Sequence, residues 1–175
     1  MFPNISADLK RFSTAGKMSI RIFLRGFLSQ GFQAIIVYRF FHFLLKHTIP
    51  AQPFRFFVER FIEITTGISI PAKCRIGKGL RIHHFGGIIF HPSVILGANC
   101  TIYHQVTVGD RGGTGGAAKI GDNVLIGAGA KIIGEITIGE NCIIGANSVV
   151  TKSIPSNMVA TGNPSQIKPK NSNEQ

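Results

Sequence analysis

The sequence has few acidic residues, few cysteines and no long apolar run, and each shortage narrows the possible functions. Only 8 of the 175 residues are Asp or Glu, against 19 Lys or Arg, and the formal net charge is +11. Up to Thr65 the chain carries nine basic and three acidic residues, a net +6. Such an excess suits an anionic partner, whether nucleic acid, an acidic membrane surface or a phosphorylated cofactor. Because the chain has no dense Lys/Arg run and no basic motif interleaved with aromatic residues, we expect no nucleic-acid partner.

The longest apolar stretch, Phe32 to Leu45, is too short and too polar to cross a bilayer as a helix. Arg39 and His42 interrupt it, whereas a transmembrane helix needs about 20 predominantly apolar residues. The beginning, MFPNISADLK, has no positively charged region that leads into an apolar stretch, so we expect no cleaved signal peptide. We predict a cytoplasmic protein without a transmembrane helix, with the inner face of the membrane as an alternative location.

What the chain does have is an aliphatic residue at every sixth position through most of its length after residue 65. The positions are Ile70, Ile76, Ile82, Leu96, Ile102, Val108, Ile120, Ile126, Ile132, Ile138, Ile144 and Val150. Such a repeat predicts a parallel β-helix, in which three hexads form one coil of a triangular prism and neighbouring coils stack about 4.7–4.9 Å apart. We predict an all-β fold with a helical segment over residues 1–65, the β-helix over 66–155 and a C-terminal cap and tail over 156–175.

Two places interrupt the repeat, and function is expected at such departures from a regular scaffold. From Ile82 the next position in phase is Phe90, eight residues later, and the two additional residues fall within 83–87. Between Val108 and Ile120 the phase survives, but the middle hexad is the glycine-rich stretch 110–116. We predict that this stretch forms a loop extruded from the prism.

The segment before the prism, from Met18 to Glu63, reads as two or three helices. Arg39, His42 and Lys46 follow one another at the i, i+3 and i+7 positions of a helix that is otherwise apolar. This narrow polar stripe favours packing against the prism or a neighbouring subunit. Peripheral attachment of the basic helices to an acidic membrane is the alternative.

The three cysteines share one position in the repeat. Cys74, Cys100 and Cys142 each lie four residues after a repeat aliphatic residue, a slot that Ala130 and Ser148 also occupy. We interpret the slot as an inward position for small side chains, in preference to a metal site or a disulfide.

Two histidines occupy matching places in successive coils. His84 follows Ile82 by two residues and His104 follows Ile102 by two, so they share a corner unless the additional residues displace His84. An imidazole, with an ordinary pKa of about 6.5, can take a proton from an alcohol near neutral pH. We therefore predict that His84 acts as a general base on a hydroxyl group. We also predict that His83 and His104 contact the molecule that carries this hydroxyl, the acceptor.

A second column of small residues is predicted at a different corner. Its members are Gly109, Gly127 and Gly145, spaced 18 residues apart, and the following Asp110, Ala128 and Ala146. The nearly bare outward positions predict a shallow groove where backbone amides can approach an extended pantetheine arm. Simple economy of turn residues is the alternative interpretation.

The stretch from Gly67 to Pro164 resembles a known family in several motifs, namely IGKGLRIHH, HQVTVGDRGG, IGAGAKIIGEITIGENCIIGANSVV and GNP. It is similar to the serine acetyltransferase branch of the hexapeptide-repeat acyltransferases, and more similar still to acetyltransferases of exopolysaccharide synthesis of the colanic-acid type. The resemblance implies a left-handed β-helix, although crossovers are usually right-handed. It also implies a homotrimer with acetyl-CoA between adjacent prisms and no metal cofactor.

In the family's pattern His84 matches the catalytic histidine. Gly109, Ala128 and Ala146 match positions that line coenzyme A. Arg111 and Lys131 are our own candidates for binding its phosphates. The implied reaction is direct acetyl transfer to a hydroxyl, with an oxyanion stabilised by backbone amides.

The chain departs from serine acetyltransferases at the residues that pair with serine. Those enzymes place an Asp before the catalytic His, another Asp in the preceding coil and an Arg-His pair after the loop. Here the corresponding residues are His83, Ser69 and the pair Gly116-Ala117. Loss of these charged partners predicts a sugar hydroxyl of a surface polysaccharide as acceptor, with L-serine as the alternative.

Two further interpretations belong to other classes of protein. A zinc-dependent protein of the γ-type carbonic anhydrase kind needs three histidines across a subunit interface, and His83, His84, His91 and His104 supply enough imidazoles. A non-catalytic scaffold of the same shape is the other alternative. Metal analysis distinguishes the first of these from an acyltransferase, and measurement of coenzyme A binding distinguishes the second.

Overall fold

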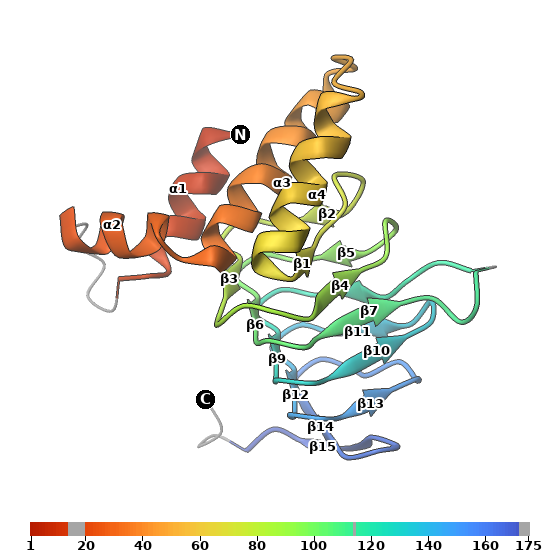
Figure 1. The fold of residues 1–175 in the computed structure, drawn as a ribbon. Helices are drawn as coiled ribbons and strands as arrows, with labels where there is room; N and C mark the ends of the chain where they lie inside the picture. Colours follow the sequence, from red (N-terminus) through yellow and green to blue (C-terminus); the bar gives the residue numbers. More distant parts are fainter. Residues whose placement is uncertain (14–19, 114, 172–175) are drawn as a thin grey trace.

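The structure is a computed structural model that describes residues 1–13, 20–113 and 115–171. Helices cover one end of a triangular β-prism, and the C-terminal strands close the other end (Figure 1). The helices are α1 (Phe2–Lys10), α2 (Ile20–Phe27), α3 (Gln30–Lys46) and α4 (Phe54–Thr66). They include the two or three helices predicted between Met18 and Glu63, whereas α1 was not predicted.

Three sheets form the faces of the prism, and each short strand pairs with the strand one coil above and below. Sheet A contains β1 (Ile68–Ser69), β4 (Ile88–Phe90), β7 (Thr107–Gly109), β10 (Lys131–Ile133) and β13 (Val149–Val150). Sheet B contains β2 (Arg75–Ile76), β5 (Ile95–Leu96), β8 (Lys119–Ile120) and β11 (Thr137–Ile138). Sheet C contains β3 (Arg81–Ile82), β6 (Thr101–Ile102), β9 (Leu125–Ile126), β12 (Ile143–Ile144), β14 (Met158–Thr161) and β15 (Gln166–Pro169).

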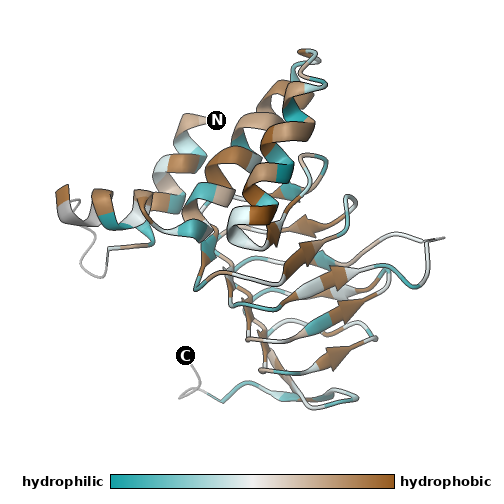
Figure 2. Ribbon diagram, viewed as in Figure 1, coloured by the Kyte–Doolittle hydropathy of each residue, from teal (hydrophilic) through white to brown (hydrophobic). Residues whose placement is uncertain are grey.

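The repeat aliphatic residues stack in register along each sheet and fill the prism. In sheet C, Ile82 pairs with Ile102, Ile102 with Ile126 and Ile126 with Ile144. All four side chains are at most 2% exposed, and full burial of an isoleucine is worth about 1.5–3 kcal/mol. The strands are correspondingly hydrophobic along the prism (Figure 2). The predicted parallel β-helix is confirmed.

The glycine-rich stretch adds a whole hexad to its coil. Val108 in sheet A pairs with Ile132, 24 residues later, and not with Ile126. Residues 110–113, 115 and 116 belong to a loop that projects beyond the prism beside β7 (Figure 1), which confirms the predicted loop. Because the loop is one hexad long, the six-residue spacing of the aliphatic positions continues unchanged across it. Every later hexad, however, lies on the next face of the prism from the one that uninterrupted counting would give it.

The two additional residues after Ile82 lengthen the corner that carries His84. In the coil below, the N–H of Gly129 donates to the carbonyl oxygen of His104 (2.9 Å). One coil higher, the N–H of Gln105 donates to Gly86 (2.9 Å) and not to His84. Gly86 therefore takes the position of His84 in the ladder, and His84 bulges outward with a positive φ of 64°.

The polar stripe of α3 faces the prism. Arg39 is 3% exposed and pairs with Asp8 of α1, with 3.0 Å between its Nε and Oδ2. It also donates to the carbonyl oxygen of Ile76 (2.6 Å), and the half-buried His42 lies 2.9 Å from that of Ala72. These contacts confirm the predicted packing. None of the helices in the described ranges is long and apolar enough to cross a membrane.

The cysteines point inward as predicted. Cys74, Cys100 and Cys142 are each 0% exposed, like Ala130 and Ser148 in the same slot. Burial raises the pKa of the Cys74 thiol to about 12 and that of Cys100 to about 11. All three thiols fill the core of the prism, and those of Cys74 and Cys100 stay protonated at neutral pH.

The last coil ends in a hairpin. β14 continues sheet C below β12, and β15 pairs antiparallel with β14 at the end of the sheet. The antiparallel strand interrupts the stacking of coils, which is what a cap requires. Of the predicted cap and tail over 156–175, residues 172–175 lie outside the described part of the chain.

Candidate active site

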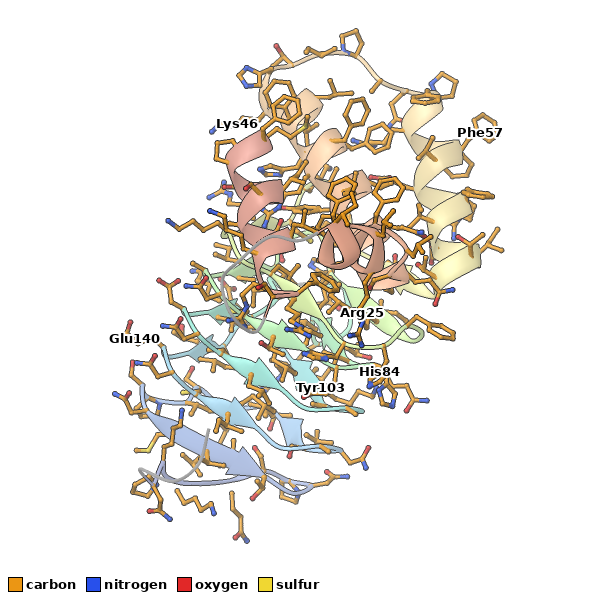
Figure 3. All side chains as sticks on the ribbon, turned by 90° about the vertical axis from the view of Figure 1, so that its left-hand side faces the viewer. Arg25, Lys46, Phe57, His84, Tyr103 and Glu140 are labelled. Atoms are coloured by element: carbon orange, nitrogen blue, oxygen red, sulfur yellow. The ribbon has the colours of Figure 1, made fainter. Side chains whose placement is uncertain are left out.

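The turn between β3 and β4 presents His84 at the edge of the prism, just below the helices (Figure 3). Its side chain is exposed. The ring stands edge-on to that of His104, with centroids 5.7 Å apart and an interplanar angle of 88°. The lengthened turn thus changes the backbone position of His84 but keeps the two imidazoles together, as their spacing predicted.

His83 is held on the other side of the same turn. Its ring stacks on that of Tyr103 with centroids 4.9 Å apart and 13° between the planes. Burial lowers the pKa of His83, and the nearby positive charges of Arg81, His84 and Arg11 lower it further. His83 is therefore neutral at pH 7, where it can serve as a hydrogen-bond partner for an acceptor and not as a cation.

His104 contributes an unsatisfied polar atom to this corner. Its Nδ1 is buried and has no hydrogen-bond partner among the described residues. Buried polar atoms in proteins are nearly always hydrogen-bonded, so such an exception indicates a site for a ligand or a water molecule. The position fits the predicted contact between His104 and an acceptor, which stays a prediction.

Two carboxylates that could be considered as orienting partners of His84, those of Glu63 and Asp110, bind other groups. Glu63 accepts a hydrogen bond from Arg60 (2.8 Å). Asp110 accepts one from the backbone N–H of Gly113 inside the glycine-rich loop. The described rings next to His84 are those of His104 and His83, the latter with its centroid 6.4 Å away.

A hollow of about 500 Å³ opens beside His84. It lies between the turn after β3 and the junction of α2 with α3. The lining residues are Leu28, Ser29, Gln30, Gly31, Gln33, His84 and Phe85. The hollow has amide, hydroxyl and imidazole groups on its walls but no carboxylate, so it suits a hydroxyl compound without a positive charge.

Two of the small residues predicted to line coenzyme A, Ala128 and Ala146, lie at the same corner of the prism as the histidines. We call this corner the histidine corner (His84, His104, Ala128 and Ala146). Ala128 lies directly below His104, whose carbonyl oxygen binds the following Gly129 N–H. Ala146 lies one coil lower, with the N–H of Asn147 donating to Ala128 (2.8 Å). The predicted column at a different corner is therefore wrong, because the additional hexad of the loop moves these residues to sheet C.

Gly109 is separated from Ala128 and Ala146 for the same reason. It pairs with Ile133 in sheet A, at the edge from which the loop leaves. The predicted alignment of Gly109 with Gly127 and Gly145 is wrong, since Gly127 stacks on Gly145 in sheet C without it. A role of Gly109 in binding coenzyme A stays a prediction, but at the other edge of the face.

The two cations predicted to bind the phosphates of coenzyme A, Lys131 and Arg111, lie near opposite ends of the strands of sheet A. Lys131 begins β10 beside the histidine corner and donates from Nζ to the carbonyl oxygen of Gln105 (2.6 Å). Arg111 is exposed in the loop, where its guanidinium donates to the carbonyl oxygen of Thr151. A ligand that used both cations would have to cross the face of sheet A.

The sequence analysis did not identify two contributions to the site. Tyr103 supports His83, and its place one residue after a repeat isoleucine could have indicated an outward aromatic residue at this corner. Arg11, just after α1, donates to Thr101 Oγ1 (2.8 Å) and adds positive charge near His83. No signal in the sequence places Arg11 there, because it depends on how α1 docks.

His91 is not part of this cluster. It follows β4 at the other edge of sheet A and its Nδ1 lies 2.8 Å from Ser93 Oγ. In the parts of the chain that the structure describes, no three His, Cys, Asp or Glu side chains are close enough to hold a metal ion. A zinc site of the carbonic anhydrase kind would thus need residues from another subunit.

Comparison with known proteins identifies relatives of the whole fold. The bacterial transferase hexapeptide family (six repeats) matches residues 117–152. A serine acetyltransferase of Synechococcus elongatus is 33% identical over 172 residues, which cover 95% of this chain and 68% of the relative. Several other relatives are matched over about half of their own length.

Two crystal structures of serine acetyltransferases with bound ligands superimpose closely. The Neisseria gonorrhoeae enzyme in complex with serine has a TM-score of 0.83 and 33% identity, covering 94% of this chain and 68% of that one. The Brucella abortus enzyme in complex with coenzyme A has a TM-score of 0.85 and 30% identity, covering 97% and 68%. These relatives are serine acetyltransferases and do not support the predicted closer likeness to exopolysaccharide enzymes.

Proposed function

Since the chain belongs to the hexapeptide-repeat acyltransferases, we propose that it transfers an acetyl group from acetyl-CoA to a hydroxyl, with L-serine as acceptor. The observation that best supports this reaction is that His84 is exposed beside a hollow. It lies at the upper end of the histidine corner, with Ala128 and Ala146 in the coils below. The serine-bound and coenzyme A-bound relatives support this acceptor and this donor.

In the proposed mechanism an unprotonated nitrogen of His84 removes the proton of the acceptor hydroxyl as its oxygen attacks the thioester carbon. Backbone N–H groups stabilise the oxyanion of the tetrahedral intermediate. Collapse of that intermediate expels the thiolate of coenzyme A, and the imidazolium of His84 supplies its proton. A positioned base contributes about 10²–10⁴-fold, and alignment of the two substrates supplies much of the remainder.

The donor fits the chemistry of the residues that the proposal assigns to it. The small side chains of Ala128 and Ala146 leave the backbone of the histidine corner accessible to a pantetheine arm. Lys131 beside that corner is placed to pair with a phosphate, and Gly109 and Arg111 extend the same face to the loop. We include a homotrimer in the proposal, with acetyl-CoA between adjacent prisms, to be tested by sedimentation equilibrium.

One observation favours a second acceptor class, a hydroxyl compound without a positive charge, such as a sugar. The titratable groups that act on His83 and Arg81 are Arg11, Arg25, His84, Tyr103 and each other, with no carboxylate among the described residues. The ammonium group of serine would meet only like charges there, whereas serine binding requires an anionic partner. Ser69 and His83 occupy the positions of the two aspartates of serine acetyltransferases, so these positions also lack an anionic partner for the ammonium group.

Release of free coenzyme A, followed with L-serine and with a panel of sugars, tests both acceptors on one enzyme. A kcat/KM for L-serine of about 10⁴ M⁻¹s⁻¹ or higher would establish serine. A sugar that reaches this range while serine does not would establish the second class. The variant His84→Ala serves as control in each assay, because turnover that survives in it does not come from the proposed site.

A further inference from the structure

Helix α2 carries an unpartnered apolar face. Ile20, Phe23, Leu24 and Phe27 follow the i, i+3, i+4, i+7 pattern of one side of a helix, and Leu28 extends this side past the last turn. We call these five residues the α2 face. Each of them is 45 to 73% exposed. The helix projects sideways from the bundle, away from the prism (Figure 1), and in the described part of the chain this side stays open to solvent.

The opposite side of α2 is already packed. Gly26 is buried, and a Cβ atom placed on it would lie 2.6 Å from Leu9 Cδ1 and 3.7 Å from the ring of Phe12. This close approach to α1 holds the helix in place and fixes which side faces outward. The α2 face is therefore presented by the fold and is not an unfilled part of the core.

The segment around α2 has charge of one sign only. From Leu9 to Val58 the sequence contains eight Lys or Arg residues and no Asp or Glu. Asp8, the nearest acidic residue before it, is buried in its ion pair with Arg39. Arg25 of α2 is exposed, and its charge acts on Arg81. An apolar helix side in a segment that carries cations and no carboxylates matches the interface of a bilayer that contains anionic lipid.

We propose that the α2 face binds the surface of an anionic membrane, with its apolar side chains among the headgroups and acyl chains and Arg25 beside lipid phosphates. A second copy of this chain fits the face less well, since it would bring its own excess of positive charge to the contact. The helix enters the interface without crossing the bilayer, in keeping with its eight residues.

Binding in this manner also places the candidate active site. Leu28, at the end of the α2 face, lines the same hollow as His84. The hollow therefore opens next to the membrane when α2 is bound. This geometry does not depend on the identity of the acceptor, and vesicle binding can be measured without acetyl-CoA.

Co-sedimentation of the full chain with vesicles tests the proposal. Vesicles of phosphatidylcholine alone are compared with vesicles that also contain phosphatidylglycerol, at low and high salt. We expect binding only to the anionic vesicles, weakened by salt. The triple variant Phe23→Ser, Leu24→Ser, Phe27→Ser should bind them at least about tenfold more weakly, since it removes most of the buried apolar area.

A matched control comes from α4, where Phe57 and Phe61 are 65% and 64% exposed. The variant Phe57→Ser, Phe61→Ser removes a similar apolar area elsewhere and should keep its affinity for anionic vesicles. The proposal is overturned by absence of wild-type binding, by equal binding to neutral vesicles, or by a triple variant that binds like the wild type. Equal loss in the α4 variant, or loss in the triple variant together with a smaller oligomer in solution, would also overturn it.

Discussion

The rings of His84 and His104 lie edge-on to one another with their centroids 5.7 Å apart. They stay together although the backbone of His84 no longer occupies the matching position in the hydrogen-bond ladder between the two coils. Gly86 takes the hydrogen bond that the regular coil would assign to His84. The additional residues therefore project His84 toward the hollow while the coil below keeps its ring in place. A catalytic base needs this combination of access and orientation.

Replacement of His84 by alanine should lower kcat by at least about 10²-fold and leave the Kd of acetyl-CoA nearly unchanged, because the base acts on the acceptor. Steady-state kinetics and calorimetric titration with acetyl-CoA measure the two effects separately. His91→Ala is the matched control, since His91 lies at the other edge of sheet A and should keep wild-type turnover. Nearly normal kcat in His84→Ala would remove the assignment.

Ala128→Trp should raise the KM for acetyl-CoA and spare folding, because the side chain emerges from the histidine corner onto the surface. Glu140→Trp places the same bulk at an exposed position on another corner, where the kinetics should not change. Acetyl-CoA titrations with thermal unfolding as a check separate obstruction from misfolding. An unchanged KM with normal thermal stability would show that the donor does not pass over Ala128.

Asp8→Ala should destabilise the protein by about 3–5 kcal/mol, since it leaves the buried positive charge of Arg39 without its carboxylate partner. Asp8 also accepts a hydrogen bond from the backbone N–H of Leu80 (2.8 Å), which joins α1 to the prism. The exposed pair of Arg60 and Glu63 provides the control, because Glu63→Ala should cost less than about 1 kcal/mol. Urea denaturation measures both values, and similar losses in the two variants would contradict the prediction.

Protonation of His83 should destabilise the fold. Its pKa in the folded protein is lowered from 6.5 by burial and by neighbouring positive charges, so the unfolded chain binds the proton first as the pH falls. Stability should therefore decrease below about pH 6.5 until the folded-state pKa is reached. His83→Phe should show a smaller decrease in urea denaturation over this range. An NMR titration that gives His83 a pKa at or above 6.5 would contradict the explanation.

The sequence was sufficient to predict the prism because one repeated physical demand, burial of an aliphatic side chain at every sixth position, determines both strand and register. It also predicted the pairing of His84 with His104, since both positions are counted from stacked isoleucines. Ala128 and Ala146 were assigned to the wrong corner because a loop of one hexad leaves no trace in the phase. The observed strand pairings, such as those of Ile102 with Ile126 and Val108 with Ile132, reveal the additional hexad.

The helical segment was less predictable, because its geometry depends on contacts between residues far apart in the chain. Asp8 and Arg39 are 31 residues apart, and neither position in the sequence indicates that the two are buried together. The α2 face lies outside the hexapeptide repeat, and its exposure in the fold distinguishes it from a core helix.

The burial of all three cysteines makes the glycine-rich loop a convenient place for a spectroscopic reporter. Thiol reagents attack accessible thiolates, and all three thiols of the prism are buried. Gly115 lies in open space, where an added side chain meets nothing within 4 Å, and it has no positive φ to strain. A fluorophore attached through Gly115→Cys would therefore label one position of the otherwise unaltered chain and report directly on movements of the loop when coenzyme A binds.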